Sequence, residues 1–251
     1  MDISQAKAVV TGAGSGLGAA TARHFASNGA QVTVLDLSEE QGNAVAAEIG
    51  GNFVQADVTD EASVESAISA AAEAMGGINT CINCAGIATG ERLVGRDGPH
   101  DLVRFRRTVD INLVGSFNVM RLAAAHMAGN APDGDGARGV IVNTASIAAF
   151  DGQKGQAAYA ASKAGIAGLS LPAARDMASL GIRVMAIAPG VFRTPMLEGL
   201  GDEIMDSLAA DVTFPKRLGL PEEFARLAAF IVSCNYLNGE TIRLDGALRM
   251  P

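Results

Sequence analysis

Hydrophobic and polar positions follow two alternating periods along the chain. Short apolar runs rich in β-branched residues, typical of buried strands, alternate with longer segments whose apolar positions recur at helical spacing. This order predicts right-handed strand–helix–strand units and an α/β fold, a doubly wound parallel sheet with helices on both faces. Strands are expected at residues 6–11, 31–36, 52–55, 80–83, 139–144, 183–188 and 241–244. Helices are expected near residues 16–28, 39–49, 61–75, 101–127, 159–180, 203–210 and 221–232.

Three segments interrupt this order. Residues 89–100 and 129–139 contain clustered glycine and proline and predict surface loops. A third irregular stretch, residues 189–201, follows a strand at the edge of the sheet where doubly wound folds bind ligands. We expect a substrate lid at about 190–215. No linker and no internal repeat divides the chain, which predicts a single domain over residues 1–251.

Charge and hydropathy exclude several classes of protein. The 251 residues hold 19 Lys and Arg against 27 Asp and Glu, which gives a formal charge of −8. A broad nucleic-acid surface is therefore not expected, since phosphate contacts need concentrated Lys and Arg. No apolar stretch approaches the roughly 20 residues of a membrane span. A strand begins too near Met1 to leave room for a signal or transit peptide, so we expect a cytoplasmic protein.

Cysteine and histidine positions indicate neither a disulfide framework nor a metal site. The cysteines number 3, which is odd. Cys81 and Cys84 spell C-x-x-C in an expected strand, where positions three apart face opposite sides of the sheet, so a redox pair is not expected. His24, His100 and His126 are scattered and do not combine with the cysteines into a metal-ligand pattern.

A glycine-rich turn between the first strand and the first helix is the strongest sign of a ligand site. Residues 11–18 read Thr-Gly-Ala-Gly-Ser-Gly-Leu-Gly. Glycines there permit a tight turn and a close approach of the backbone to a pyrophosphate. The helix N-terminus adds free N–H groups and a partial positive charge. An acidic protein can hold a dinucleotide in this way.

Acidic residues end the second and third strands. A carboxylate at Asp36 can accept both ribose hydroxyls of NAD and would repel a 2′-phosphate, although Asp36 is also a candidate helix cap. Leu37 follows it, and the glycine turn has no Arg or Lys, so we expect NAD rather than NADP. Asp57 and Val58 are candidates for the adenine pocket. Asp57 or Asp60 is equally a candidate cap for the next helix.

Tyr159 and Lys163 are spaced i, i+4 in an expected helix, so their side chains share one face. A free tyrosine has a pKa of about 10, too high for a base at neutral pH. A neighbouring ammonium and the positive charge of an oxidised nicotinamide favour the phenolate. The pair therefore predicts a group that takes a hydroxyl proton while hydride leaves the adjacent carbon.

Two further polar residues fit the same chemistry. Ser146 follows the strand 139–144 at the carboxyl edge, where its hydroxyl orients a substrate oxygen beside Tyr159 or caps a helix. Asn112 lies in an apolar part of the expected helix 101–127. It indicates a helix kink, a buried water site or a proton relay from Lys163 to solvent.

Together these residues resemble the short-chain dehydrogenase/reductase family over essentially the whole chain. The resemblance implies a seven-stranded Rossmann sheet in the order 3-2-1-4-5-6-7, an Asn–Ser–Tyr–Lys tetrad and a homotetramer in which apolar helix faces form interfaces. It rests on residues 11–18, Asp36, Asn83-Cys84-Ala85-Gly86, Asn112, Ser146, Tyr159 with Lys163, and Pro189-Gly190 with Thr194.

Within the family, segments 138–146, 152–159, 187–192 and 237–247 resemble the type-II 3-hydroxyacyl-CoA dehydrogenases, a subfamily also known for 17β-hydroxysteroid dehydrogenase activity. The subfamily implies NAD-linked interconversion of a 3-hydroxyacyl-CoA and a 3-oxoacyl-CoA. The alternatives are a steroid, polyol or xenobiotic-ketone dehydrogenase and a non-catalytic NAD-binding scaffold. The substrate contacts that the subfamily resemblance implies are Ser146, Gln153 and Tyr159. The implied cofactor contacts are Gly12, Ser15, Gly16, Leu17, Gly18, Asp36, Leu37, Asp57, Val58, Cys84, Ala85, Gly86, Tyr159, Lys163, Pro189, Gly190, Phe192 and Thr194.

One segment departs from the subfamily. The loop 89–100 is shorter than in the mitochondrial members and has Arg92 and Arg96 but no lysine. If this loop helps to seat CoA phosphates, the expected cations are these two arginines together with Lys216 and Arg217.

Overall fold

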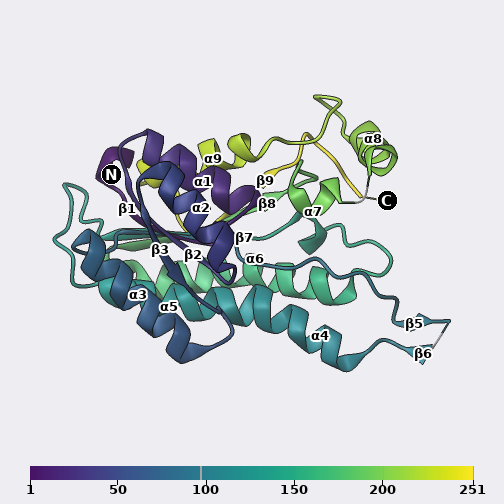
Figure 1. The fold of residues 1–251 in the computed structure, drawn as a ribbon, viewed down its shortest axis with the longest axis horizontal. Coiled ribbons are helices and arrows are strands. Elements are labelled where there is room, and N and C mark those ends of the chain that lie inside the picture. Colours follow the sequence, from purple (N-terminus) through teal and green to yellow (C-terminus); the bar gives the residue numbers. More distant parts are fainter. Residues whose placement is uncertain (97, 200, 251) are drawn as a thin grey trace.

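A seven-stranded parallel sheet forms the centre of the molecule (Figure 1). The computed structural model describes residues 1–96, 98–199 and 201–250. The strands of the sheet are β1 (Lys7–Thr11), β2 (Gln31–Asp36), β3 (Asn52–Gln55), β4 (Thr80–Asn83), β7 (Gly139–Thr144), β8 (Ile182–Pro189) and β9 (Thr241–Leu244). Their order is β3-β2-β1-β4-β7-β8-β9. The predicted fold class and strand order are confirmed.

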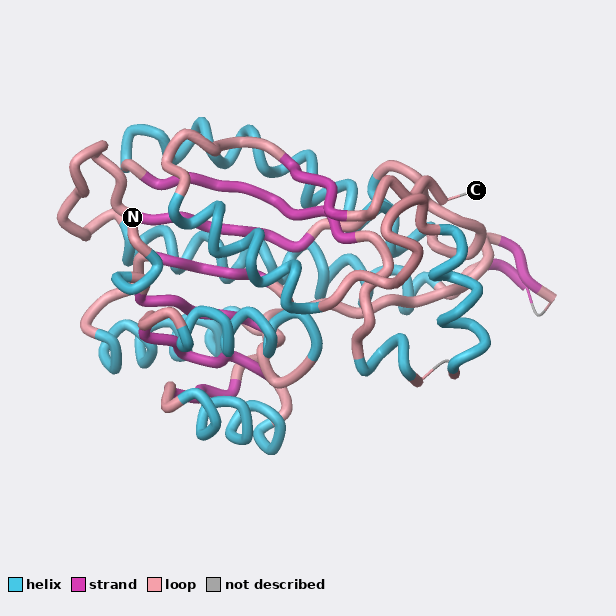
Figure 2. The backbone as a smooth tube through the Cα atoms, turned by 90° about the horizontal axis from the view of Figure 1, so that it is seen from above, coloured by secondary structure: helices cyan, strands magenta, loops and turns pink. Residues whose placement is uncertain are grey.

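Helices cover both faces of this sheet. The α-helices are α1 (Gly16–Ser27), α2 (Glu39–Ile49), α3 (Glu61–Met75), α4 (Leu102–Val109), α5 (Ser116–Met127), α6 (Ala157–Met177), α7 (Pro195–Glu198), α8 (Asp202–Asp211) and α9 (Pro221–Ser233). Short 3-10 turns are η1 (Ile3–Gln5), η3 (Ile147–Ala149) and η4 (Ala178–Leu180). α1, α2 and α9 pack on one face, and α3, α5 and α6 pack on the other (Figures 1 and 2).

Each face of the sheet encloses its own apolar core. The central strands β7 and β8 are buried along their whole length, because helices cover them on both sides. Val9 and Cys81 point to the side of α3, α5 and α6, while Val10 and Ile82 point to the side of α1 and α9, as alternation along a strand requires. Cys84 packs on the second side and both thiols are free, so the predicted separation of the C-x-x-C pair is confirmed.

The expected helix over residues 101–127 is interrupted in its middle. A π-helical segment, η2 (Asp110–Gly115), separates α4 from α5. Hydrophobic spacing does not reveal it, because the apolar pattern continues across the wider turn. π-helical segments occur mostly where a helix is re-aimed at a functional site, and Asn112 lies within this one.

Two of the expected loops contain short regular elements. The segment 89–100 holds a hairpin of β5 (Val94–Gly95) and β6 (Gly98–Pro99), and the segment 189–201 holds α7. Elements this short leave no periodicity in a sequence. The loop 129–139 is confirmed up to Gly139, which begins β7.

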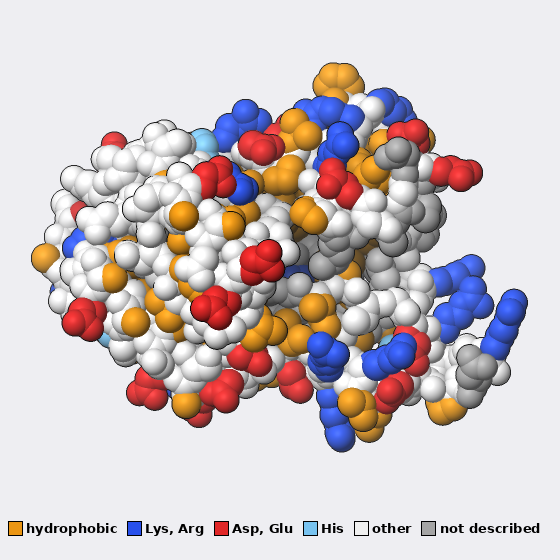
Figure 3. All heavy atoms as spheres, in the orientation of Figure 1, with side chains coloured by type: hydrophobic (Ala, Val, Ile, Leu, Met, Phe, Trp, Pro, Cys, Tyr) orange, Lys and Arg blue, Asp and Glu red, His pale blue; other side chains and the backbone are white. Residues whose placement is uncertain are grey.

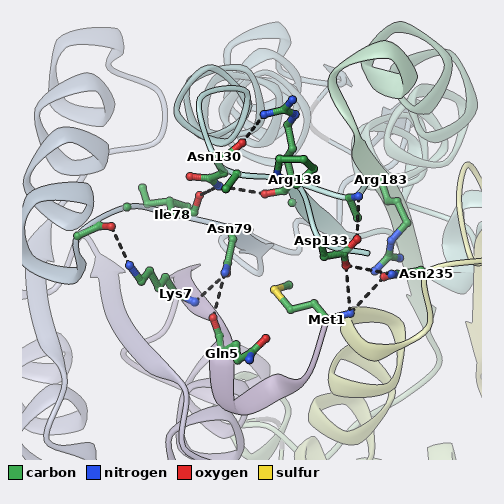
Figure 4. Close-up of a pocket in the computed structure, with 16 residues that line it drawn as sticks. Met1, Gln5, Lys7, Ile78, Asn79, Asn130, Asp133, Arg138, Arg183 and Asn235 are labelled. Carbon is green, nitrogen blue, oxygen red and sulfur yellow. Dashed lines mark hydrogen bonds and ion pairs between the residues drawn. The ribbon is translucent and has the colours of Figure 1, made fainter. Parts of the chain in front are cut away.

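Polar contacts hold the amino-terminal edge of the sheet together around a pocket of about 230 Å³ (Figure 4). Helices in a parallel α/β fold end at this edge, so their C-terminal carbonyls and negative dipole ends gather here. Lys7 Nζ donates to the carbonyl that follows α3 at 2.7 Å, and Arg183 donates to two carbonyls of the last turn of α9 at 2.9 Å. The Asn79 and Asn130 side chains bind backbone groups of neighbouring segments. These contacts make the edge a structural clamp.

Candidate active site

The turn from β1 to α1 is so compact that only glycine fits at two of its positions. Gly12 has φ +62°, and a Cβ there would lie 2.8 Å from the Ala85 backbone. A Cβ at Gly18 would lie 2.3 Å from the Gly12 carbonyl oxygen. Ser15 stands at the N-cap of α1, with an exposed side chain that makes no cap bond to the described chain. The first N–H groups of α1 are therefore open to an anionic ligand.

Asp36 ends β2 beside this glycine turn. Its Oδ2 accepts a hydrogen bond from Gly14 N at 2.8 Å, and its Oδ1 accepts one from Ser38 N at 2.9 Å. Ser38, rather than Asp36, caps α2. The carboxylate is thus fixed against the glycine turn, while the Leu37 side chain next to it is 65% exposed.

The cap of α3 is Asp60, whose Oδ1 accepts from Ser63 N at 2.8 Å. Asp57 is left for another role, and its Oδ1 accepts from Thr59 N at 2.9 Å and Thr59 Oγ1 at 2.7 Å. Val58 is buried, and its carbonyl accepts from the Asn118 side chain at 3.3 Å. Both residues lie after β3 at the carboxyl edge, and their contact with an adenine stays a prediction.

The chain that leaves β4 passes between the glycine turn and α6. Thr11 Oγ1 accepts from Cys84 N and from Ala85 N, each at 3.1 Å. A Cβ at Gly86 would lie 3.0 Å from Asn112 Oδ1 and 3.6 Å from Lys163 Nζ, so these side chains meet at this glycine. Burial raises the pKa of the Cys84 thiol to about 11, which keeps it protonated and unreactive at neutral pH.

Tyr159 and Lys163 lie on the same face of α6, as predicted. The Lys163 Nζ is 5.8 Å from the centroid of the Tyr159 ring. Lys163 is only 5% exposed, and its ammonium donates to the Thr144 carbonyl at 2.7 Å. Burial lowers the pKa of Lys163 to about 8. The ammonium is therefore held in a buried site at the end of β7.

Burial also raises the pKa of Tyr159, and the neighbouring Ser146 hydroxyl acts in the opposite direction. The pKa of Tyr159 is thus raised by the protein, whereas the sequence had led us to expect a lowered pKa. The reason is that removing water destabilises the phenolate more than the hydrogen bond with Ser146 stabilises it. The phenol is consequently a proton donor at neutral pH.

Ser146 follows β7, and of the two roles considered for it the structure shows the helix cap, while its contact with a substrate oxygen stays a prediction. Its Oγ accepts from Ala148 N at 3.1 Å and so caps η3. The same hydroxyl lies beside the Tyr159 phenol. Gln153 lies further along the loop to α6, where its backbone N donates to Gln156 Oε1 at 3.0 Å and its side chain is half-buried.

Asn112 braces the loop after β4 against α6. Its amide accepts from Ile87 N at 2.8 Å and donates to Ile87 O at 2.9 Å and to Ser162 Oγ at 3.0 Å. Ser162 Oγ donates in turn to the Tyr159 carbonyl at 2.8 Å. The predicted kink is present as η2. Both amide hydrogens are used within the chain, so the side chain acts as a brace, and its part in a proton relay stays a prediction.

Pro189 and Gly190 lead the chain from the end of β8 toward the glycine turn. Pro189 is buried, and Gly190 N donates to Leu244 O at 2.9 Å. A Cβ at Gly190 would lie 2.9 Å from Asp245 Cα. This turn therefore packs directly on the chain that leaves β9.

Thr194 and Phe192 follow this turn and point in different directions. A Cβ at Gly16 would lie 3.6 Å from Thr194 Cγ2, so Thr194 faces the glycine turn. Phe192 is 7% exposed, and its ring packs where a Cβ at Gly219 would meet it at 2.8 Å. The Phe192 side chain thus packs into the core, and its contact with a cofactor stays a prediction.

Sequence reasoning missed three residues that hold the site together. Thr11 fixes the chain after β4, Thr144 supplies the carbonyl that binds Lys163, and Ser162 joins Asn112 to Tyr159. All three are buried polar residues at a strand end or beside a catalytic candidate. That placement is the one signal by which the sequence could have revealed them.

Basic side chains lie on both sides of the hollow that opens beside the site (Figure 3). Arg92 and Arg96 are exposed on the arm that carries β5 and β6, and neither forms an ion pair with a described residue. Arg217 is paired with Glu223 at 2.8 and 2.9 Å, and Lys216 Nζ donates to a backbone carbonyl at 3.0 Å. Of the four expected cations, the two on the arm therefore have the most donors available for a phosphate.

Two further observations concern metals and membranes. Across the described ranges, no group of three or more His, Cys, Asp or Glu side chains could hold a metal ion. Among the helices searched there, none has the length and apolar character needed to cross a membrane.

Comparison with known proteins gives matches over nearly the whole chain. A family profile described as short chain dehydrogenase matches residues 6–204. The 3-hydroxyacyl-CoA dehydrogenase type-2 of Homo sapiens is 51% identical over 247 residues, covering 97% of this chain and 95% of the relative. The protein of the same name from Drosophila melanogaster is 50% identical over 252 residues, covering 99% of each. The crystal structure of 3-hydroxyacyl-CoA dehydrogenase type-2 from Mycobacterium avium has a TM-score of 0.93 and 47% identity, covering 97% of this chain and 96% of that chain.

Proposed function

Because the chain belongs to the short chain dehydrogenase family and is an oxidoreductase, we propose that it interconverts a secondary alcohol and a ketone with NAD. The observation that carries the proposal is the meeting of Tyr159, Ser146 and a buried Lys163 at the carboxyl edge of the sheet. The relatives that match nearly the full length are named as 3-hydroxyacyl-CoA dehydrogenases. We therefore take a 3-hydroxyacyl-CoA as the substrate.

NAD fits the residues around the glycine turn. Gly12 and Gly18 leave a cradle that any Cβ would fill, and the start of α1 supplies N–H groups for a pyrophosphate. Asp36 is held in place by two backbone bonds and keeps oxygen lone pairs for ribose hydroxyls. Its charge would repel a 2′-phosphate. When bound, NAD supplies the nicotinamide that accepts or returns hydride.

Tyr159, Ser146 and Lys163 divide the work on the substrate oxygen. In reduction, the Tyr159 phenol donates its proton to the ketone oxygen, and burial keeps that proton in place at neutral pH. In oxidation, Tyr159 takes the proton back from the hydroxyl. Ser146 orients the substrate oxygen with its hydroxyl. Lys163, held by the Thr144 carbonyl, has donors left for the cofactor ribose and favours the phenolate when it forms.

Asn112 supports this constellation from behind. Through Ser162 it fixes the first turn of α6 that carries Tyr159, and through Ile87 it fixes the chain after β4. We therefore include Asn112 in the tetrad as a structural brace. We also propose that a chain of water molecules beside it carries protons from Lys163 to solvent.

The substrate enters between the arm and the segment 190–215, which we propose as a lid. This segment contains α7 and α8 and begins at the turn of Pro189 and Gly190, which we propose holds the nicotinamide. Arg92 and Arg96 on the arm are the cations proposed for the CoA phosphates, since Arg217 is already paired with Glu223. Replacing both arginines by Met should raise KM for acetoacetyl-CoA and leave turnover of an uncharged ketone unchanged.

The chain also carries apolar side chains suited to association with further copies. Val114, Phe117 and Leu171 are 48%, 45% and 45% exposed on η2, α5 and α6. These side chains support the homotetramer implied by the family resemblance. Analytical ultracentrifugation at micromolar concentration should give four times the 25.5 kDa of the chain, and a monomer would contradict the proposal.

Absorbance of NADH tests the proposed reaction directly. Acetoacetyl-CoA, a ketosteroid and a simple ketone are offered in turn, and acetoacetyl-CoA should be turned over with the highest kcat/KM. Faster turnover of the ketosteroid would assign the steroid activity instead. Tyr159→Phe should abolish turnover and leave NADH binding, measured by fluorescence titration, intact. Substantial activity in this variant would remove Tyr159 from its acid–base role.

A further inference from the structure

An ionic cluster links β9 to the loop between Ser146 and Tyr159. Arg243 of β9 donates through Nη2 to Asp151 Oδ2 at 2.5 Å and through Nε to Asp245 Oδ2 at 2.7 Å. The three side chains are 22%, 19% and 8% exposed, in the order Arg243, Asp151 and Asp245. Charge-assisted bonds that are partly withdrawn from water are stronger than surface pairs. Asp151 lies 92 residues from Arg243 in the chain, so this contact joins distant parts of the fold.

The two carboxylates belong to segments on opposite sides of the proposed reaction. Asp151 stands in the loop that begins at Ser146 and ends where α6 presents Tyr159. Asp245 packs on the turn after β8, since a Cβ at Gly190 would lie 2.9 Å from Asp245 Cα. Arg243 therefore spans the distance between the side that holds the substrate oxygen and the side proposed to hold the nicotinamide.

A small apolar cluster adjoins Arg243, whose Nη2 also donates to the Leu248 carbonyl at 3.1 Å. Ile147 from η3, Val212 from the end of α8 and Leu248 from the C-terminal segment pack together and are buried. The Arg243 guanidinium also lies 5.4 Å from the centroid of the Phe150 ring. Ala247 has φ +62°, an uncommon conformation for a residue with a side chain, and strain of this kind persists where surrounding contacts over-determine the backbone. The segment after β9 is thus held in one conformation against both loops.

We propose that Arg243 is a positioning residue for hydride transfer, which it serves by tying the Ser146–Tyr159 loop through Asp151 and the Gly190 turn through Asp245 into one rigid unit. The inference rests on the proposed function, because the spacing it controls is that between substrate carbon and cofactor. A misplacement of about 1 Å at a reacting centre costs on the order of a hundredfold in rate. Loosening one of the two ties should cost less, about tenfold in kcat.

Asp151→Asn is the test variant, because it keeps the size of the side chain and removes the charge that Arg243 binds. Its matched control is Glu48→Gln, since Glu48 forms a similar pair with Arg23 at 2.7 to 2.9 Å between α1 and α2, away from the site. Asp151→Asn should lower kcat about tenfold, with KM for NADH within about twofold of the wild type. The control should leave kcat unchanged.

Two readouts separate positioning from a loss of folded protein. With NADH deuterated at the transferred position, the isotope effect on kcat should rise in Asp151→Asn, because the chemical step becomes more rate-limiting. A smaller folded fraction would not change it. Hydrogen–deuterium exchange of the cofactor-free chain should be faster over residues 147–156 in this variant and unchanged in the control. Asp151→Asn should add little to the loss when combined with Arg243→Met, because Arg243→Met already removes the contact with Asp151 along with the one to Asp245.

The outcomes are distinguishable from those of the proposed function. If the wild type turns over acetoacetyl-CoA and Asp151→Asn matches it in kcat and isotope effect, Arg243 does not position the site. Unchanged exchange over residues 147–156 overturns the tie itself, and it does so even if the wild type reduces none of the offered ketones. Retained activity in Arg243→Lys, which keeps the charge, together with loss in Arg243→Met supports the proposal.

Discussion

Lys163 is needed for the proposed reaction, but burying its charge lowers the free energy of unfolding. Its ammonium is buried, donates to the Thr144 carbonyl, and has a pKa lowered from 10.5 to about 8 by loss of water. A shift of this size corresponds to about 3 kcal/mol of unfavourable burial of the charge at neutral pH. Lys163→Met removes this cost but leaves the Thr144 carbonyl without its donor, which costs about 1–3 kcal/mol. We therefore expect Lys163→Met to unfold at the same or a higher temperature, by up to about 5 °C, while turnover is lost.

The pH dependence gives a sharper test of the same reasoning. Below about pH 8 Lys163 is protonated in both the folded and the unfolded chain, so the full penalty is present. Between about pH 8 and 10.5 the unfolded chain binds more protons than the folded chain, so the stability of the wild type rises with pH and the penalty disappears. The stability advantage of Lys163→Met should thus shrink by about 2 kcal/mol between pH 7 and pH 9.5.

Urea unfolding of the wild type and Lys163→Met at these two pH values measures the difference. Lys154→Met is the control for the substitution itself, because Lys154 is exposed on the loop before α6. At pH 7 this control should change the free energy of unfolding by less than about 0.5 kcal/mol. A Lys163→Met protein that is several kcal/mol less stable than the wild type at pH 7, or a difference that does not change with pH, would refute the idea of a buried ammonium held against its desolvation cost.

Three more predictions follow from the glycine turn and the amino-terminal edge. Asp36→Ala combined with Leu37→Arg should lower kcat/KM with NADH and raise it with NADPH by at least about tenfold each, because the repelling carboxylate is replaced by a cation; an unchanged ratio would remove Asp36 from the ribose site. Gly18→Ala should abolish NADH binding and lower the Tm, since the new methyl would clash with the Gly12 carbonyl oxygen of the turn. Asn79→Ala should lower the free energy of unfolding by about 1–3 kcal/mol, because it leaves the half-buried Lys7 N–H and the buried Thr80 hydroxyl without a partner, yet kcat/KM of the folded enzyme should stay at the wild-type value.

The strands were the elements predicted most accurately, because a buried strand appears in the sequence as a continuous apolar run. Five of the seven expected strands have the observed bounds, and those are short β-branched runs flanked by turn residues. The strand order came from the family resemblance rather than from periodicity, since pairing between strands leaves no local signal. The π-helical segment at Asn112 escaped prediction because apolar spacing does not distinguish it from the helices on either side.

The sequence identified the residues of the candidate site, but it did not predict their burial or the contacts around them. Tyr159, Lys163 and Ser146 meet where they were expected, yet the direction of the Tyr159 pKa depends on burial, which no spacing reveals. Phe192 is a further example, because its ring packs into the core against Gly219, and the sequence does not indicate this packing. The contact between Arg243 and Asp151 spans 92 residues and depends on how β9 and the loop after β7 come together. Such contacts follow from tertiary structure alone.

The clamp at the amino-terminal edge has a consequence for how this scaffold can change. Cations and amides there fasten the ends of α3 and α9 to the strands. The arm with β5 and β6 and the segment with α7 and α8 instead hang from the carboxyl edge. New substrate preferences can therefore be acquired by exchanging these two segments, while the half of the molecule that secures folding is left untouched. A chimera that carries the arm of a relative should inherit its selectivity and keep the host's melting behaviour.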